Sequence, residues 1–157
     1  MTMRLESGQA APPFNAIDHE GNEVGLDDFK GGKLVMYFYP KAFTPGCTTE
    51  SCDFRDRHEA FTAAGYSIVG VSPDKPEKLS EFRAEYNLPF ALLSDPDHEI
   101  AEAYGAWGTK KNYGMEYDGI IRSTIMLGPD GSVIDAWYNV RAKGHAERVA
   151  ESALQPG

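Results

Sequence analysis

Residues 34–52 read LVMYFYPKAFTPGCTTESC, and this stretch decides the fold. It begins with a continuous apolar run over residues 34–39, which Pro40 ends. Such a short run is typical of a central strand that is buried on both faces. Thr44 and Pro45 then look like a helix start, because threonine is a good N-cap and proline suits the first helical position. A buried strand followed closely by a helix indicates an α/β protein.

The rest of the chain continues this alternation of strands and helices. Apolar runs and turn residues predict three more strands, over residues 66–71, 120–127 and 133–140. Apolar stripes at helical spacing predict three helices, over residues 45–64, 79–86 and 146–154. The last two strands should form an antiparallel hairpin. This order predicts an α/β fold with a central mixed sheet that has helices on both faces.

Length, charge and the N-terminal sequence narrow the class of protein. The 157 residues are expected to form one domain, residues 1–157. The net charge of −9 argues against nucleic-acid partners and against an anionic membrane surface, since both favour basic proteins. We find no apolar stretch typical of a signal peptide or of a membrane span, so a cytoplasmic protein is expected. Two cysteines in a cytosolic chain are more often catalytic or metal-binding than structural.

The two cysteines lie at the start of the longest predicted helix. Cys47 falls in its first turn, where free amides and the helix dipole favour a negatively charged thiolate. Phe54 and Phe61 follow Cys47 at seven-residue spacing, so all three share a face that should point at the sheet. Cys52 lies about 140° around the helix and should occupy a flank nearer to solvent.

Helix geometry keeps the two cysteines apart. Five residues of ideal helix place the Cα atoms of Cys47 and Cys52 roughly 8.7 Å apart. A disulfide rarely spans more than about 7 Å between Cα atoms. An intact helix can therefore hold both cysteines only as thiols, and a bond between them requires local unwinding.

Three alternatives remain open on spacing alone. A C-x4-C pair is equally compatible with two unrelated buried cysteines, which behave as small apolar residues. A zinc site that uses His58 lacks a fourth ligand and the usual C-x2-C spacing. A thiol–disulfide exchange protein normally carries C-x-x-C, which is absent here.

A resemblance to a known family favours a catalytic pair. Pro40, Thr44 and Cys47 match the peroxiredoxin active-site pattern Pro-x-x-x-Thr-x-x-Cys. A second cysteine five positions later, Cys52, is similar to the peroxiredoxin Q branch, also called bacterioferritin-comigratory protein. Three further segments resemble that family in the same order, residues 8–14, 104–124 and 137–145. The resemblance thus covers nearly the whole chain.

The resemblance implies a thioredoxin-like fold and a peroxidase cycle without a metal, haem or flavin cofactor. Cys47 would be the peroxidatic residue, and Cys52 would resolve its sulfenic acid as an intramolecular disulfide. Thr44 would hydrogen-bond the peroxide, Pro40 would shield the pocket, and Arg122 would reach in from its strand. Hydrogen peroxide and organic hydroperoxides would be the substrates. Thioredoxin or a similar dithiol protein would reduce the disulfide.

The chemistry requires more than an ionised cysteine. A free thiol is about 3% thiolate at pH 7, so full ionisation gains at most roughly thirtyfold, or about 2 kcal/mol. Any larger acceleration needs donors for the charge that develops on the peroxide oxygens. Arg122, Thr44 and the amides of Gly46 and Cys47 are candidates. We expect Glu50 to be a first-turn carboxylate that complements the helix dipole rather than a catalytic group.

Two other functions remain as rivals. A thiol–disulfide exchange protein could use the same fold, and a non-catalytic binding or chaperone-like module could retain it. We expect Lys110 and Lys111 to lie in a solvated loop. Because both cysteines lie in one chain, the cycle needs no partner subunit, and a monomer is expected.

Overall fold

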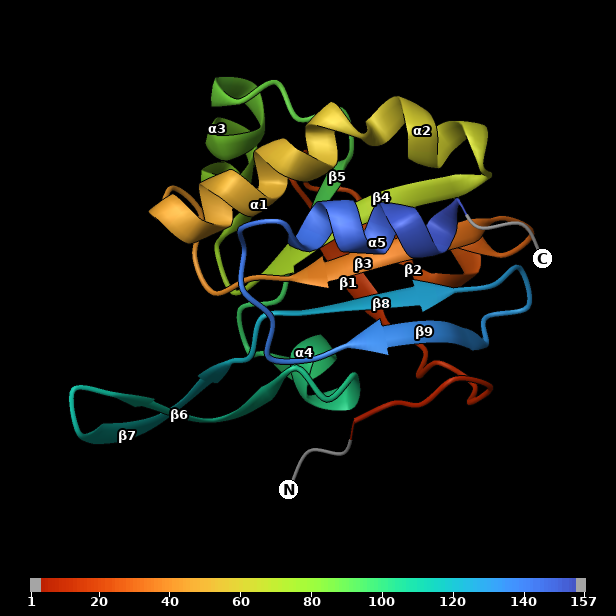
Figure 1. Ribbon diagram of the computed structural model, residues 1–157. Coiled ribbons are helices and arrows are strands. Elements are labelled where there is room, and N and C mark those ends of the chain that lie inside the picture. The colour runs from red at the N-terminus through yellow and green to blue at the C-terminus, as the bar shows by residue number, and fades with distance from the viewer. Residues whose placement is uncertain (1–3, 155–157) are drawn as a thin grey trace.

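The computed structural model describes residues 4–154 and is built around one large sheet (Figure 1). Its seven strands are β1 (Asn15–Asp18), β2 (Glu23–Gly25), β3 (Lys33–Phe38), β4 (Tyr66–Ser72), β5 (Ala91–Ser94), β8 (Ser123–Leu127) and β9 (Val133–Trp137). Their spatial order is β2-β1-β5-β4-β3-β8-β9. Strand β3 pairs parallel to β4 and antiparallel to β8, so the predicted mixed sheet is confirmed.

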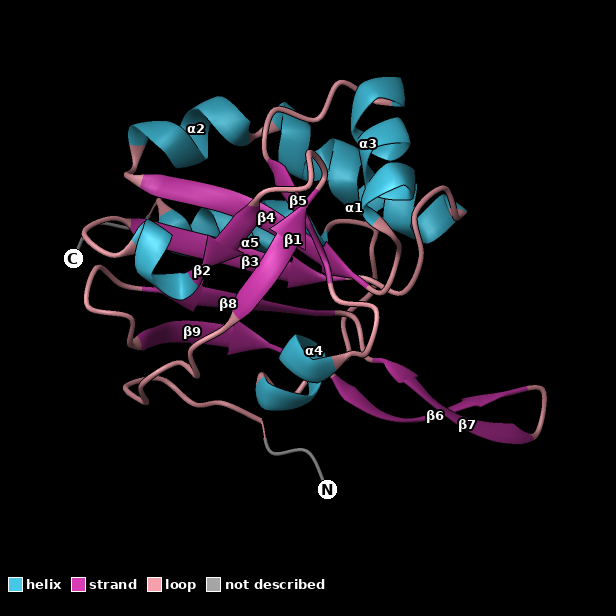
Figure 2. Cartoon of the chain, turned by 180° about the vertical axis from the view of Figure 1, so that it is seen from behind, coloured by secondary structure: helices cyan, strands magenta, loops and turns pink. Residues whose placement is uncertain are grey.

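Helices cover both faces of this sheet, as predicted. The helical elements are η1 (Leu26–Phe29), α1 (Pro45–Asp56), α2 (His58–Ala63), α3 (Pro76–Glu85), α4 (Glu99–Ala103) and α5 (His145–Ala153). One apolar cluster joins the sheet to α1, α2, α3 and α5, and a second joins its other face to η1 and α4. Figure 1 views the molecule from the side of α5, and Figure 2 views it from behind.

Strand β3 is the buried centre that its sequence predicts. Residues 34–38 are at most 1% exposed. Val35 and Tyr37 belong to the cluster beneath α1, whereas Leu34, Met36 and Phe38 belong to the opposite cluster. The continuous apolar run is explained because both faces of the strand are covered by helices.

Three predicted elements differ clearly from the structure, and one of them is the strand expected over residues 133–140, which ends at Trp137. The helix expected over residues 45–64 is broken at Arg57, whose φ of −107° and ψ of 6° leave the helical range, so α1 and α2 are separate. The strand expected over residues 120–127 begins only at Ser123. The backbone before it makes hydrogen bonds to other segments of the chain. The amide of Ile121 donates to the carbonyl of Ala106, and the carbonyl of Arg122 accepts from the amide of Val140.

Residues 107–120 form a separate hairpin that the sequence analysis missed. Strands β6 (Trp107–Asn112) and β7 (Met115–Ile120) pair antiparallel and project from the end of the main sheet (Figures 1 and 2). Lys110 and Lys111 therefore lie on a strand, and the expected loop is wrong. In the described part of the chain, no helix combines the length and apolar character needed to cross a bilayer.

Buried His145 makes stability depend on pH. Its Nε2 lies 2.7 Å from the hydroxyl of Thr124, and the side chain is fully buried. Burial, together with the charges of Arg148 and Arg122, lowers the pKa of His145 to about 4. An unfolded histidine titrates near 6.5, so the stability contributed by neutral His145 is present above pH 6.5 and is lost as the pH falls toward 4.

We therefore expect a His145→Gln variant to be less sensitive to acid than the unmodified protein. Glutamine can still hydrogen-bond Thr124 but does not titrate. Between pH 7 and pH 4 the unmodified protein should lose about 3 kcal/mol of unfolding free energy relative to the variant. Urea unfolding of both proteins at several pH values measures this difference, and parallel pH curves would contradict the prediction.

Candidate active site

The loop between β3 and α1 is held by a partly buried polar contact. The carboxylate of Asp74 accepts hydrogen bonds from the backbone amide of Ala42 and from the hydroxyl of Ser72, both at 2.8 Å. Phe43 adopts a positive φ of 68°, which turns the chain into the helix. This arrangement fixes the direction from which α1 starts.

Thr44 occupies the predicted N-cap position of α1. Its hydroxyl does not cap the helix, however, but donates to the carbonyl of Lys41 at 2.7 Å. The hydroxyl proton is thereby engaged, and the lone pairs of Oγ1 remain available as acceptors.

The two cysteines have the surroundings that helix geometry predicts. Cys47 is 1% exposed, and Phe54 and Phe61 on the same face are fully buried. Cys52 is partly exposed on the flank of α1, and both cysteines are free thiols. Burial raises the pKa of the Cys52 thiol, and nearby Arg55 opposes that shift. Both predicted orientations are confirmed.

Arg122 brings a positive charge to Cys47. Its Nη2 donates to the Sγ of Cys47 at 3.3 Å, and its Nη1 donates to Oε1 of Glu50 at 2.7 Å. Burial alone would lower the pKa of Arg122, but Glu50 and Cys47 raise it overall, so the guanidinium stays charged. A Cβ at Gly46 would lie 3.2 Å from Nη2, so glycine leaves the room that the guanidinium needs.

Arg122 reaches this position from a connection rather than from a strand. It lies between β7, which ends at Ile120, and β8, which begins at Ser123. The expectation that it projects from within a strand is therefore wrong, although the side chain does reach the cysteine. Its irregular backbone lets the side chain leave the direction imposed by the sheet.

Glu50 is the residue that the sequence analysis misjudged. It is fully buried, it lies beyond the first turn of α1, and it forms an ion pair with Arg122. Burial raises the pKa of Glu50 to about 7, and Arg122 acts in the opposite direction. Among the described residues its Oε2 has no hydrogen-bond partner. The signal in the sequence was the three-residue spacing from Cys47, which places both side chains on one helix face.

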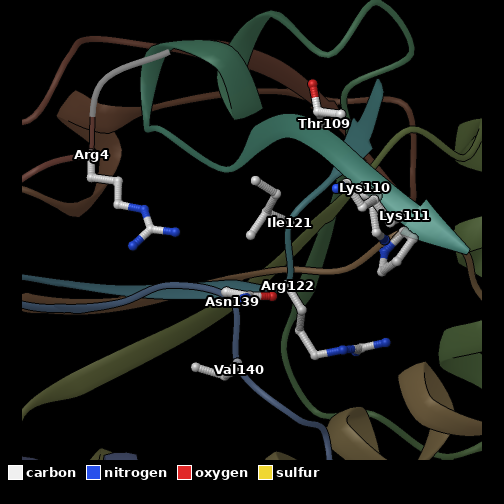
Figure 3. A pocket seen from close by; sticks show the side chains of 9 residues that line it. Arg4, Thr109, Lys110, Lys111, Ile121, Arg122, Asn139 and Val140 are labelled. Carbon is white, nitrogen blue, oxygen red and sulfur yellow. The ribbon is translucent and has the colours of Figure 1, made fainter. Parts of the chain in front are cut away.

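Pro40 and Arg122 both line a cavity of about 440 Å³ beside this site. Figure 3 labels Arg122 among the lining residues. Pro40 lies two residues after the end of the buried strand β3 and is half-buried. Neither Cys47 nor Cys52 is among the residues that line the cavity, and Cys47 adjoins it through its contact with Arg122. The structure thus gathers Pro40, Arg122 and Cys47 at one end of the sheet and leaves Cys52 on the flank of α1.

Aromatic residues near the site have structural roles. Tyr37 and Tyr39 are fully buried and stack on each other, and the hydroxyl of Tyr37 lies 2.8 Å from that of Ser51. This contact ties α1 to β3. Trp107 stacks on His98 with ring centroids 3.7 Å apart.

The zinc site that spacing left open can be compared with the structure. Residues 4–154 contain no group of three or more His, Cys, Asp or Glu side chains placed to hold a metal ion.

Known proteins include several that are similar to this chain over nearly its whole length. Residues 7–136 match the AhpC/TSA family. A putative peroxiredoxin of Mycobacterium tuberculosis is 51% identical over 148 residues, which covers 94% of each chain. Peroxiredoxin Bcp of Bacillus subtilis is 50% identical over 153 residues, which covers 98% of this chain and 95% of the other.

Solved structures agree as well. Peroxiredoxin Q of Xanthomonas campestris superposes with a TM-score of 0.87 at 36% identity, over 95% of this chain and 97% of the other. This likeness confirms the thioredoxin-like fold. The family match, the identities and the fold agree in their assignment, and the chain belongs to the AhpC/TSA family, in its peroxiredoxin Q or Bcp branch.

Proposed function

We propose that this peroxidase reduces hydrogen peroxide and organic hydroperoxides through Cys47 and Cys52. The Cys47 thiolate attacks one peroxide oxygen, so an S–O bond forms while the O–O bond breaks. The leaving oxygen takes up a proton and departs as water or an alcohol. The Cys52 sulfur then attacks the sulfenic acid of Cys47, an S–S bond forms, and water leaves. Thioredoxin or a similar dithiol protein restores both thiols.

The contact between Arg122 and Cys47 carries this proposal. Negative charge moves from sulfur to the peroxide oxygens during the attack, and a guanidinium 3.3 Å from the sulfur is placed to stabilise that charge. The free amides at the start of α1 add donors on the same side. Thr44 can accept the peroxide proton and so orient the O–O bond.

A single-turnover experiment tests the proposed function. The fully reduced protein is mixed with one equivalent of hydrogen peroxide, and peroxide and free thiols are then counted. We expect one peroxide to consume both thiols and the mass of the intact chain to show an intramolecular disulfide. Retention of both thiols beside unreacted peroxide would contradict the proposal and favour a non-catalytic module. Addition of thioredoxin and its reductase should then give continuous turnover.

Resolution should require part of α1 to unfold. The intact helix holds the two Cα atoms roughly 8.7 Å apart, beyond the reach of about 7 Å for a disulfide. Thr48 and Thr49 are mediocre helix formers, so little intrinsic propensity resists unwinding. Two buried contacts do resist it, the Tyr37–Ser51 hydrogen bond and the Glu50–Arg122 ion pair.

Hydrogen exchange measures this opening. Amides of residues 47–54 should exchange faster in the disulfide form than in the dithiol form. Helix α3 has neither cysteine and serves as the internal control, with equal exchange in both forms. Equal protection of residues 47–54 in both redox states would refute the need for unwinding.

We propose that the protein acts as a monomer in the cytoplasm. The donors around Cys47, from Arg122 and from the start of α1, belong to the same chain as both cysteines, so no subunit has to complete the site. Light scattering at micromolar concentration should give the mass of one chain in both redox states. A dimer mass in either state would contradict this prediction.

A further inference from the structure

The cavity beside Arg122 is strongly basic although the protein is acidic. Arg4, Lys110, Lys111 and Arg122 all line it, which is four of the 15 cationic side chains in a chain of net charge −9. Among the described residues, no acidic side chain lines this cavity. Figure 3 shows Arg4 on one side of Ile121 and Lys110 on the other. Such clustering gives the cavity a local field opposite in sign to that of the whole protein.

Two of these charges are paired with carboxylates and two are not, although Arg4 lies over the ring of Tyr138 at 5.2 Å from its centroid. Arg122 is paired with buried Glu50, and Lys111 lies 3.5 Å from Glu116 in an exposed pair. Within residues 4–154, neither Lys110 nor Arg4 has a carboxylate at salt-bridge distance. Partial burial and the charge of Arg122 lower the pKa of Lys110. An anion in the cavity would oppose this shift, because it supplies a countercharge to Lys110 and offsets the repulsion from Arg122.

The hairpin is shaped to keep Lys110 at this place. Strand β6 pairs Lys110 with Tyr117, and a Cβ at the nearby Gly119 would lie 3.3 Å from the Cδ of Lys110. A side chain at this position of β7 would therefore press on the stem of Lys110. The remaining polar lining, from Thr109 and Asn139, adds hydrogen-bonding groups.

The cavity adjoins the reaction site, because Arg122 lines the cavity and also donates a hydrogen bond to Cys47. A hydroperoxide whose O–O bond lies beside the contact between Cys47 and Arg122 can direct its organic substituent along the cavity toward Lys110. We infer that this cavity binds an anionic group, such as a carboxylate, on the organic part of the hydroperoxide substrate. This inference rests on the proposed peroxidase function and adds a substrate preference to it.

A matched pair of hydroperoxides tests the preference. Cumene hydroperoxide that carries a carboxylate at the para position is compared with its methyl ester, which has the same reacting centre but no charge. Single-turnover rate constants for the full chain are measured with each, and with hydrogen peroxide. The protein should react faster with the carboxylate than with the ester, and Lys110→Gln should reduce that ratio by roughly fivefold, as expected for one partly exposed ion pair.

Lys30→Gln is the control for net charge. It removes one cation from an exposed pair with Asp27, beside the β8–β9 turn at the opposite end of β8 from Arg122. The carboxylate-to-ester ratio of this variant should match that of the unmodified protein. A ratio of one in the unmodified protein, or an equal loss in both variants, would overturn the inference. If hydrogen peroxide is reduced normally and the carboxylate-to-ester ratio is one, only the anion site is contradicted. If no peroxide is reduced, the proposed function is contradicted as well.

Discussion

A Cys47→Ser variant is expected to lose all measurable peroxide reduction. Serine keeps the shape of the side chain, and Arg122 and the amides of α1 remain in place around it. Its hydroxyl is a weak nucleophile at neutral pH, whereas a thiol provides a thiolate. The stabilising groups alone cannot break an O–O bond, so the defect should be in the first chemical step.

The matched control is Cys52→Ser, which leaves Cys47 and its donors unchanged. This variant should consume one equivalent of peroxide at a nearly normal rate and then stop with Cys47 as a sulfenic acid. Stopped-flow measurement of peroxide loss, followed by the mass of the intact protein, distinguishes the two variants. Equal single-turnover activity of both would show that the roles of Cys47 and Cys52 are wrongly assigned.

An Arg122→Ala variant is expected to slow peroxide attack by on the order of 10²-fold to 10³-fold, the usual effect of removing one preorganised donor. The side chain donates to Cys47 and is partly buried, so water replaces it poorly. Glu50→Gln should have a smaller effect, because the amide oxygen can still accept from Arg122 and hold its orientation. The Arg122 guanidinium itself would remain.

Alkylation of Cys47 by an uncharged reagent separates the two roles that Arg122 can have. Alkylation depends mainly on thiolate content, whereas cleavage of the O–O bond also needs stabilisation of the leaving oxygen. In Arg122→Ala, the rate constant for peroxide attack should therefore fall by a larger factor than the rate constant for alkylation. Equal factors for the two reactions would mean that Arg122 acts only on the ionisation of the cysteine.

Local features of the chain were predictable from the sequence because they depend on neighbouring residues. The apolar run of β3, the Thr44–Pro45 helix start and the faces of Cys47 and Cys52 follow from strand and helix periodicity. Short strands such as β2 escaped detection because three residues do not define an alternation. The break at Arg57 also escaped, since it interrupts a helical pattern that continues on both sides.

The cysteine-bearing helix and its two thiol environments were thus determined by the sequence itself, through the fixed rise and turn of the α-helix. Only the tertiary structure decided that Arg122 reaches Cys47 and pairs with Glu50, which lies 72 positions away in the chain. It also decided that a hairpin carries Lys110 to the same end of the sheet. These contacts join distant segments, and their energies depend on packing and burial, which no local pattern of residues specifies.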